Sequence, residues 1–149
     1  MKTLIQIVTV SLFLVFLHET VVAQPLNDQS QVLQKCIDLA ELQQYYPQNA
    51  DKSYKQLRIL NFPVSFPESL SVSKFGQSVL FQTRAEIHDS NPDAFMAFNT
   101  FSIIENKASI VFEISYNRLS QSPNSINGSI SLDKTSGNWI VTNLTLNNQ

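Results

Sequence analysis

Alternation of apolar and polar positions dominates the second half of this chain and predicts β-strands there. Between 108 and 116, apolar side chains take every second position. A period of two places such a set on one face of a strand, toward the core. Positions 78–87 alternate in the same way, whereas 95–104 is apolar on both faces, which is typical of a central strand. The pattern therefore predicts three strands over these ranges.

Two further strands, at 129–133 and 139–146, flank a polar stretch that contains Gly137. Glycine suits a left-handed turn position, so these strands are predicted to form a hairpin. Residues 105–107 form the loop of another hairpin. All these strands are expected to pair antiparallel.

The first half of the chain follows a different period. From 30 to 46, apolar residues recur at intervals of three and four, which predicts one amphipathic helix that ends at Pro47. Residues 24–28 are expected to be a flexible lead-in. Positions 62–67 alternate aromatic residues with proline, which excludes a central strand and leaves an edge segment or a covering loop. Short strands are expected at 57–60 and 70–75.

Together these elements predict an α+β fold with one N-terminal amphipathic helix packed on a four- to five-stranded antiparallel sheet. The helix buries its apolar stripe against one sheet face. The other face carries the polar sets of the strands, with Leu80, Val111, Trp139 and Val141 among them, and it remains available for contacts.

The N-terminus indicates export. A positively charged start at Lys2 precedes an apolar run from 4 to 17, and small residues follow at 21–23. This order is that of a secretory signal peptide. We expect residues 1–23 to be removed and 24–149 to form a single α+β domain, secreted or periplasmic, with no membrane contact after cleavage.

Charge and cysteine content narrow the function classes. Charged residues make up 15% of the chain, the formal net charge is −2, and the cationic residues are scattered, which argues against nucleic-acid binding and against an anionic membrane surface. The single cysteine, Cys36, allows no internal disulfide. We interpret it as a small buried apolar side chain, with an intermolecular disulfide as the alternative.

Candidate chemistry centres on one short segment. If 78–87 is a strand, then Arg84, Glu86 and His88 share a face, where Asp89 or Asp93 could assist in acid–base chemistry. The preferred interpretation is a solvated outer face. Glu113 is the remaining acid that a metal site could recruit, but no ligand spacing marks such a site, and no cofactor is predicted. Positions 89–93 resemble the opening of a calcium loop, yet Ala94 replaces the required glycine.

Two glycosylation sequons occur, at Asn127 and Asn143. If the source is eukaryotic, both are candidate modification sites. Asn143 is expected to face water.

The order of one helix and then strands at 78–87, 95–104, 108–116, 129–133 and 139–146 is similar to that of the cystatin-like and NTF2-like α+β superfamilies. Residues 106–112 and 132–141 resemble the hairpin pair that closes such domains. The inhibitory cystatin loop has a Q-x-V-x-G pattern, whereas this chain has Phe81 in place of the glycine. The Asp and His pocket of NTF2-like enzymes would leave only His88 and Asp89 as candidates.

These observations favour a non-enzymatic binding or protein-interaction module. Its partner is an unknown protein or small ligand, and a homodimer is among the possibilities. The polar sheet face would make the contact, with Arg84, Glu86, Glu113 and Trp139 as candidate binding residues. The alternative is an NTF2-like pocket protein or enzyme that uses His88, Glu86 and either Asp89 or Asp93.

Overall fold

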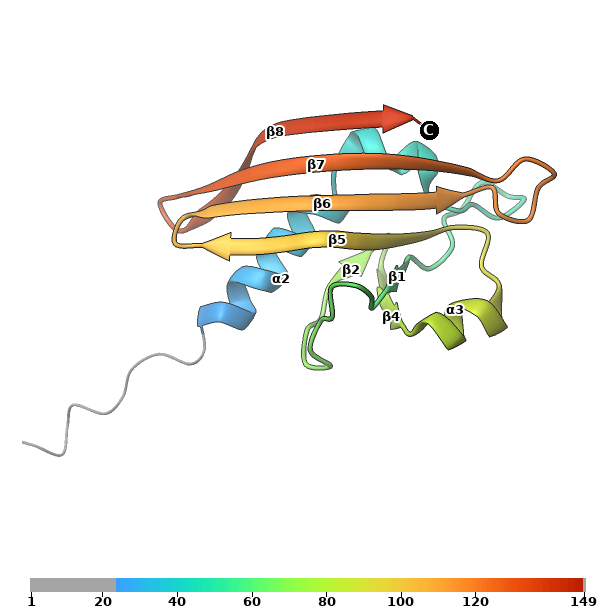
Figure 1. Cartoon of the computed structure of the whole chain (residues 1–149), viewed down its shortest axis with the longest axis horizontal. Coiled ribbons are helices and arrows are strands. Elements are labelled where there is room, and N and C mark those ends of the chain that lie inside the picture. The colour runs from blue at the N-terminus through green and yellow to red at the C-terminus, as the bar shows by residue number, and fades with distance from the viewer. Residues whose placement is uncertain (1–23, 149) are drawn as a thin grey trace, which may run out of the picture.

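The computed structural model describes residues 24–148 (Figure 1). The predicted leader, 1–23, lies outside the described residues. The chain begins with helix α2 (Gln24–Ile37) and the 3-10 helix η1 (Ala40–Tyr45), and it ends in a long β-meander. In the described part of the chain, no helix has the length and apolar character needed to cross a membrane.

The main sheet has six strands in the order β4-β1-β5-β6-β7-β8. The meander pairs antiparallel and consists of β5 (Phe95–Ile104), β6 (Lys107–Tyr116), β7 (Asn124–Thr135) and β8 (Asn138–Asn148). In contrast, β1 (Arg58–Leu60) runs parallel to both of its neighbours, β4 (Leu80–Gln82) and β5. The predicted four- to five-stranded antiparallel sheet is therefore wrong, because the sheet is mixed and has six strands.

The meander itself follows the apolar alternation closely. β5 has the predicted bounds and β6 begins one residue earlier than predicted. The last two strands are longer than predicted because their polar Ser and Asn positions lie on the outer side of the sheet, where they continue the strand instead of ending it.

The N-terminal helix differs from the prediction at both ends. Residues 24–28 are helical, not a lead-in, and α2 stops at Ile37 instead of continuing to 46. Leu39 has extended backbone (ψ 127°), and the chain resumes as η1. The Tyr46 hydroxyl donates a hydrogen bond to the Ile37 carbonyl (2.9 Å), which satisfies an acceptor at the helix end that would otherwise need a further helical turn.

The predicted strand at 78–87 is also wrong. The chain forms a small ribbon of β2 (Ser73–Lys74) and β3 (Gln77–Ser78), then β4, and then helix α3 (Arg84–Ser90). A capping box starts α3: the Glu86 amide donates to Thr83 Oγ1 (3.3 Å), and the Thr83 amide donates to the Glu86 carboxylate (2.7 Å). The two hydrogen bonds of the capping box satisfy two backbone donors at the start of the helix. They favour a helix over the strand that the apolar alternation of 78–87 predicts.

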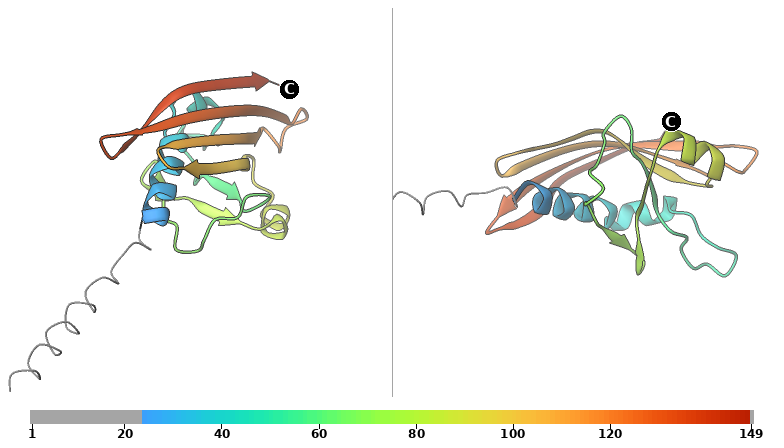
Figure 2. Two further views of the ribbon diagram at one scale, coloured as in Figure 1. Left: turned by 60° about the vertical axis from the view of Figure 1, so that its left-hand side comes forward. Right: turned by 90° about the horizontal axis from the view of Figure 1, so that it is seen from below.

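The core lies between α2 and the inner face of the meander (Figure 2). Val32, Leu33, Cys36 and Ile37 of α2 are fully buried, which accounts for the three- and four-residue spacing in this part of the helix. The Phe–Pro segment covers one end of the sheet, as a loop and not a central strand. Its Phe66 ring lies 5.5 Å from the ring of Phe98 and 5.1 Å from that of Phe101, centre to centre.

Candidate functional site

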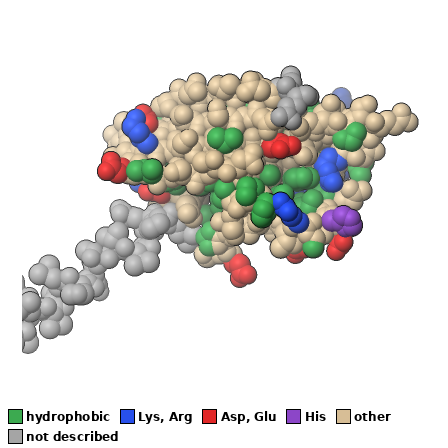
Figure 3. Space-filling view, viewed as in Figure 1, with side chains coloured by type: hydrophobic (Ala, Val, Ile, Leu, Met, Phe, Trp, Pro, Cys, Tyr) green, Lys and Arg blue, Asp and Glu red, His purple; other side chains and the backbone are tan. Residues whose placement is uncertain are grey.

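The candidate site is the outer face of β5 to β8, the side of the meander away from α2. Side chains of this face form rows across the four strands, because paired residues of neighbouring strands lie side by side. One row is Ser102, Ser109, Ser131 and Asn143, and the next is Thr100, Val111, Ser129 and Thr145. Figure 3 shows this face as a broad expanse with few charged or hydrophobic side chains.

A row with different chemistry crosses the face near the β5–β6 turn. It consists of Ile104, Lys107, Asp133 and Ile140. The two isoleucines at its ends are 70% and 52% exposed. Between them, Lys107 Nζ lies 3.6 Å from Asp133 Oδ1, so the two charges neutralise each other. The row therefore presents apolar side chains at both ends and little net charge.

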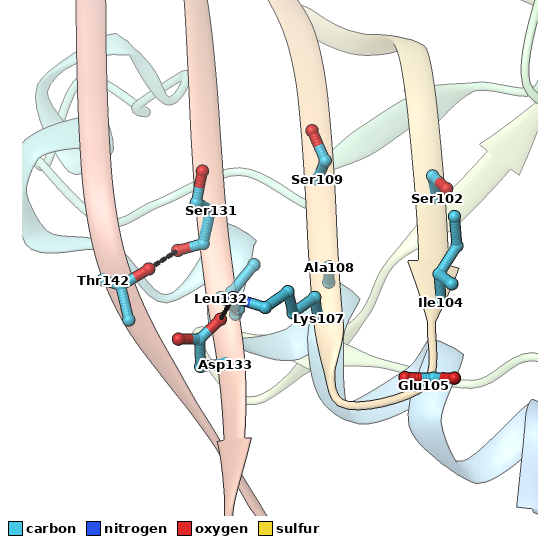
Figure 4. Close-up of a pocket in the computed structure, with 10 residues that line it drawn as sticks. All are labelled: Ser102, Ile104, Glu105, Lys107, Ala108, Ser109, Ser131, Leu132, Asp133 and Thr142. Carbon is cyan, nitrogen blue, oxygen red and sulfur yellow. Dashed lines mark hydrogen bonds and ion pairs between the residues drawn. The ribbon is translucent and has the colours of Figure 1, made fainter.

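An open depression of about 490 Å³ lies beside this row (Figure 4). Serine side chains from three strands line it, together with Thr142 at a β-bulge in β8. The Thr142 hydroxyl donates a hydrogen bond to the Ser131 carbonyl (3.1 Å) and so fixes the bulge. The lining combines these hydroxyl groups and the Lys107–Asp133 pair with the apolar residues Ile104, Ala108 and Leu132, so it offers both hydrogen-bonding and apolar contacts.

The predicted acid–base residues lie elsewhere and do not form one site. Arg84, Glu86 and His88 belong to α3 and not to a strand, so they do not share a face with a period of two. The Arg84 guanidinium lies 3.6 Å from the centre of the Phe62 ring. The Glu86 carboxylate belongs to the capping box, and hydrogen bonds from the Thr83 amide and hydroxyl lower its pKa.

His88 and Asp89 contact each other at the molecular surface. Nδ1 and Oδ1 are 3.2 Å apart, and the two side chains are 89% and 81% exposed. Neither residue lines a pocket described for residues 24–148. Asp93 accepts a hydrogen bond from the Leu119 amide (3.2 Å) and so holds a loop. Within the described residues, no three His, Cys, Asp or Glu side chains lie close enough to hold a metal ion.

Trp139 is not a surface residue, so its predicted position on the polar sheet face is wrong. It points inward from β8 and is 1% exposed. Its Nε1 donates to Asp28 Oδ1 (3.1 Å), which also accepts from Lys134 Nζ (2.7 Å). The Lys134 hydrogen bond is the main cause of the lowered pKa of Asp28. Residues 139–141 are all apolar, so alternation could not show that Ile140 is the outward-facing one.

Of the remaining predicted residues, Glu113 and Asn143 lie on the outer face of the sheet and Cys36 lies in the core. Glu113 lies on the outer face of β6, opposite Asn127, and is half-buried. Asn143 is exposed on the same face, so both sequons project from it. Cys36 is fully buried in α2, and burial raises the pKa of its thiol to about 12.

Sequence reasoning missed the hydroxyl rows. Ser125, Asn127, Ser129 and Ser131 occupy alternate positions of β7, whereas the predicted strand covers only 129–133. Their period of two was the available signal, since it continues the alternation of the strand that follows.

Comparison with known proteins found no protein family, curated protein or solved structure that matches this chain. The resemblance to cystatin-like and NTF2-like proteins stays a prediction, and function has to be argued from the site itself.

Proposed function

We propose that this protein is a non-enzymatic binding module and that the outer face of β5 to β8 is its binding surface for another protein. One observation carries the proposal: rows of uncharged hydroxyl and amide side chains cross four paired strands and end beside two exposed isoleucines.

The chemistry of the face supports a contact role. Hydroxyl and amide groups are less costly to remove from water than charges, and they hydrogen-bond as donors and acceptors. Because long strands hold them, little conformational freedom is lost on binding. Ile104 and Ile140 supply exposed apolar surface at one end, which a partner can cover.

The size of the face supports a protein partner. Four strands spaced ~4.8 Å apart and about ten residues long give roughly 600 Å². This approaches the ~800 Å² that each partner contributes to a standard interface. Among the described outer positions of β5, the one aromatic ring is Phe95, and the Arg118 guanidinium lies 5.0 Å from its centre. The face thus offers little for the stacking of a sugar ring.

Site-resolved photo-crosslinking in the producing cells tests this proposal. A photoreactive amino acid is placed at Ser109 or Ile140 on the outer face, and at Lys52, an exposed loop residue, as the control. We expect crosslinks to a different protein from both outer positions and at least ten-fold fewer from Lys52. Ser109→Arg should then reduce the crosslink from Ile140, because it adds an unpaired charge to the interface. Equal crosslinking at all positions, or none from the outer face, would refute the proposal.

A further inference from the structure

The free edge of β8 has features that favour pairing with another strand. β8 is the last strand of the sheet and has 11 residues. Figures 1 and 2 show no other described element beyond it. From 138 to 149 the sequence contains no charged residue and no proline. Natural sheets protect exposed edges with charges, proline or short strands, and a bulge at Thr142 is the one such device here.

The opposite edge of the same sheet is protected. β4 has 3 residues, and the chain turns directly into α3 after Thr83. Such a short strand offers few backbone groups to a partner. The β4 edge is therefore short and protected, whereas the part of β8 after the bulge is a longer edge with regular pairing.

That part of β8 is a sequence palindrome, Asn-Leu-Thr-Leu-Asn, from Asn143 to Asn147. Its Leu144 and Leu146 point inward, opposite Ile130 and Gly128 of β7. The asparagines and Thr145 point to the outer face, because side chains alternate along a strand.

A palindrome is self-complementary in an antiparallel pair. If two copies pair about Thr145, each Thr145 lies opposite its counterpart, and each Leu144 lies opposite Leu146 of the other copy. Each Asn143 lies opposite Asn147. Apolar side chains then meet on the inner face and polar ones on the outer face, with no charge repulsion between copies. Both leucines are half-buried within one chain, so a second copy would cover surface that is still exposed.

We propose that the edge of β8 is a self-association site at which two copies pair antiparallel about Thr145. The contact is isologous, because both copies use the same residues around a two-fold axis. It joins the two six-stranded sheets into one continuous sheet and brings the two outer faces side by side. The contact is small, so the dimer belongs to the weak class and forms at high chain concentration. This inference does not rest on the proposed binding of another protein.

Cysteine crosslinking tests the register. In the pair, the two Thr145 Cα atoms lie about 4.5–5.5 Å apart, within the range of a disulfide. Thr145→Cys should therefore give a covalent dimer under mild oxidation. Asn143→Cys is the matched control, because both substitutions alter the Asn143 sequon. In the proposed pair, however, the two introduced cysteines of an Asn143→Cys dimer would lie about four residues, or ~13 Å, apart along the strands. This variant should crosslink at least ten-fold less when alone, and efficiently when mixed with Asn147→Cys. Buried Cys36 is common to all these variants.

Charge variants test the contact by sedimentation at concentrations up to about 1 mM, where weak contacts of this size are populated. Thr145→Lys and Thr145→Glu should each be monomeric, because like charges meet at the axis, whereas their equimolar mixture should dimerise. Gln121→Lys, at an exposed position in the loop between β6 and β7, should dimerise like the unmodified protein.

A monomeric unmodified protein at that concentration would overturn the proposal. So would equal crosslinking of Thr145→Cys and Asn143→Cys, or dimers of Thr145→Lys. An extended peptide that pairs with β8 of an otherwise monomeric chain would assign the edge to another occupant and also overturn it. Outer-face crosslinks to a different protein that persist in Thr145→Lys would leave the proposed function standing while the dimer fails.

Discussion

Gly128 gives a sharp test of how tightly the inner face of the main sheet is packed. It lies in the middle of β7, opposite Phe112 of β6. The Phe112 ring is fully buried and lies over the glycine. A Cβ added at Gly128 would lie 2.6 Å from Cε1 and 2.9 Å from Cε2 of that ring, and closer still to Cζ. Gly128→Ala therefore forces the ring or a strand to move.

The size of the effect follows from two opposing contributions. Alanine is favoured over glycine in a strand interior by roughly 0.5–1 kcal/mol. Overpacking of a buried site costs roughly 1–3 kcal/mol. We expect the second contribution to prevail, so that Gly128→Ala lowers the free energy of unfolding by about 1.5 kcal/mol, or Tm by about 6 °C.

Urea unfolding monitored by the fluorescence of the single tryptophan measures this change. Ser129→Ala, at the next position and on the outer face, is the control and should stay within about 0.5 kcal/mol of the unmodified protein. Combining Gly128→Ala with Phe112→Leu should cost less than the sum of the two single changes, because a smaller side chain leaves room for the methyl group. A Gly128→Ala protein as stable as the unmodified one would refute the reasoning.

Two further predictions concern the N-terminal helix. Asp28→Asn should lower the free energy of unfolding by about 1–3 kcal/mol, because Lys134 loses its carboxylate partner. The pKa of Asp28 is lowered from 3.8, so its stabilising effect is complete above about pH 4 and disappears as the pH falls through the lowered pKa. Unfolding titrations from pH 7 to 3 should show the difference between the two proteins shrink below about pH 4, and a constant difference would contradict this. The Cys36 thiol, with its pKa raised from 9.0 to about 12, has ~1000-fold less thiolate, so a maleimide at pH 8 should label it only after unfolding. Rapid labelling of the native protein would show that the helix does not bury it.

The alternation of the sequence predicted the meander well, because half-buried antiparallel strands show a clean period of two. β5 and β6 matched their predicted ranges closely. The parallel pairing of β1 could not be predicted in this way. Three residues at 58–60 carry too little pattern to reveal which strands flank them, since these neighbours follow more than 20 residues later in the chain.

The error at 78–87 has a different cause. Thr83 and Glu86 have the spacing of a capping box, so the signal for α3 was present in the sequence. The apolar alternation of the same residues pointed to a strand, and the local hydrogen bonds of the cap decided between the two. With that segment helical, the grouping of Arg84, Glu86 and His88 was lost.

The polar character of the outer face could be predicted from the sequence, but the set of residues that form it could not. Alternation indicated a polar sheet face, and Val111 and Glu113 do lie on it. The inward orientation of Trp139 depends on the bulge and register of β8, which pair Trp139 with Lys134. Register comes from contacts between distant residues, so a pattern within one strand cannot supply it.

The link from Asp28 to Lys134 and Trp139 also determines when the fold can be completed. Lys134 follows Asp28 by 106 positions in the sequence, and Trp139 follows it by 111 positions. The ribosome makes α2 more than 100 residues before the hairpin that holds its first turns. During synthesis the first turns of α2 therefore lack this anchor, and the native state has to wait for β8. A newly made chain of this kind can collapse early, but it cannot complete its native core before Lys134 and Trp139 have left the ribosome.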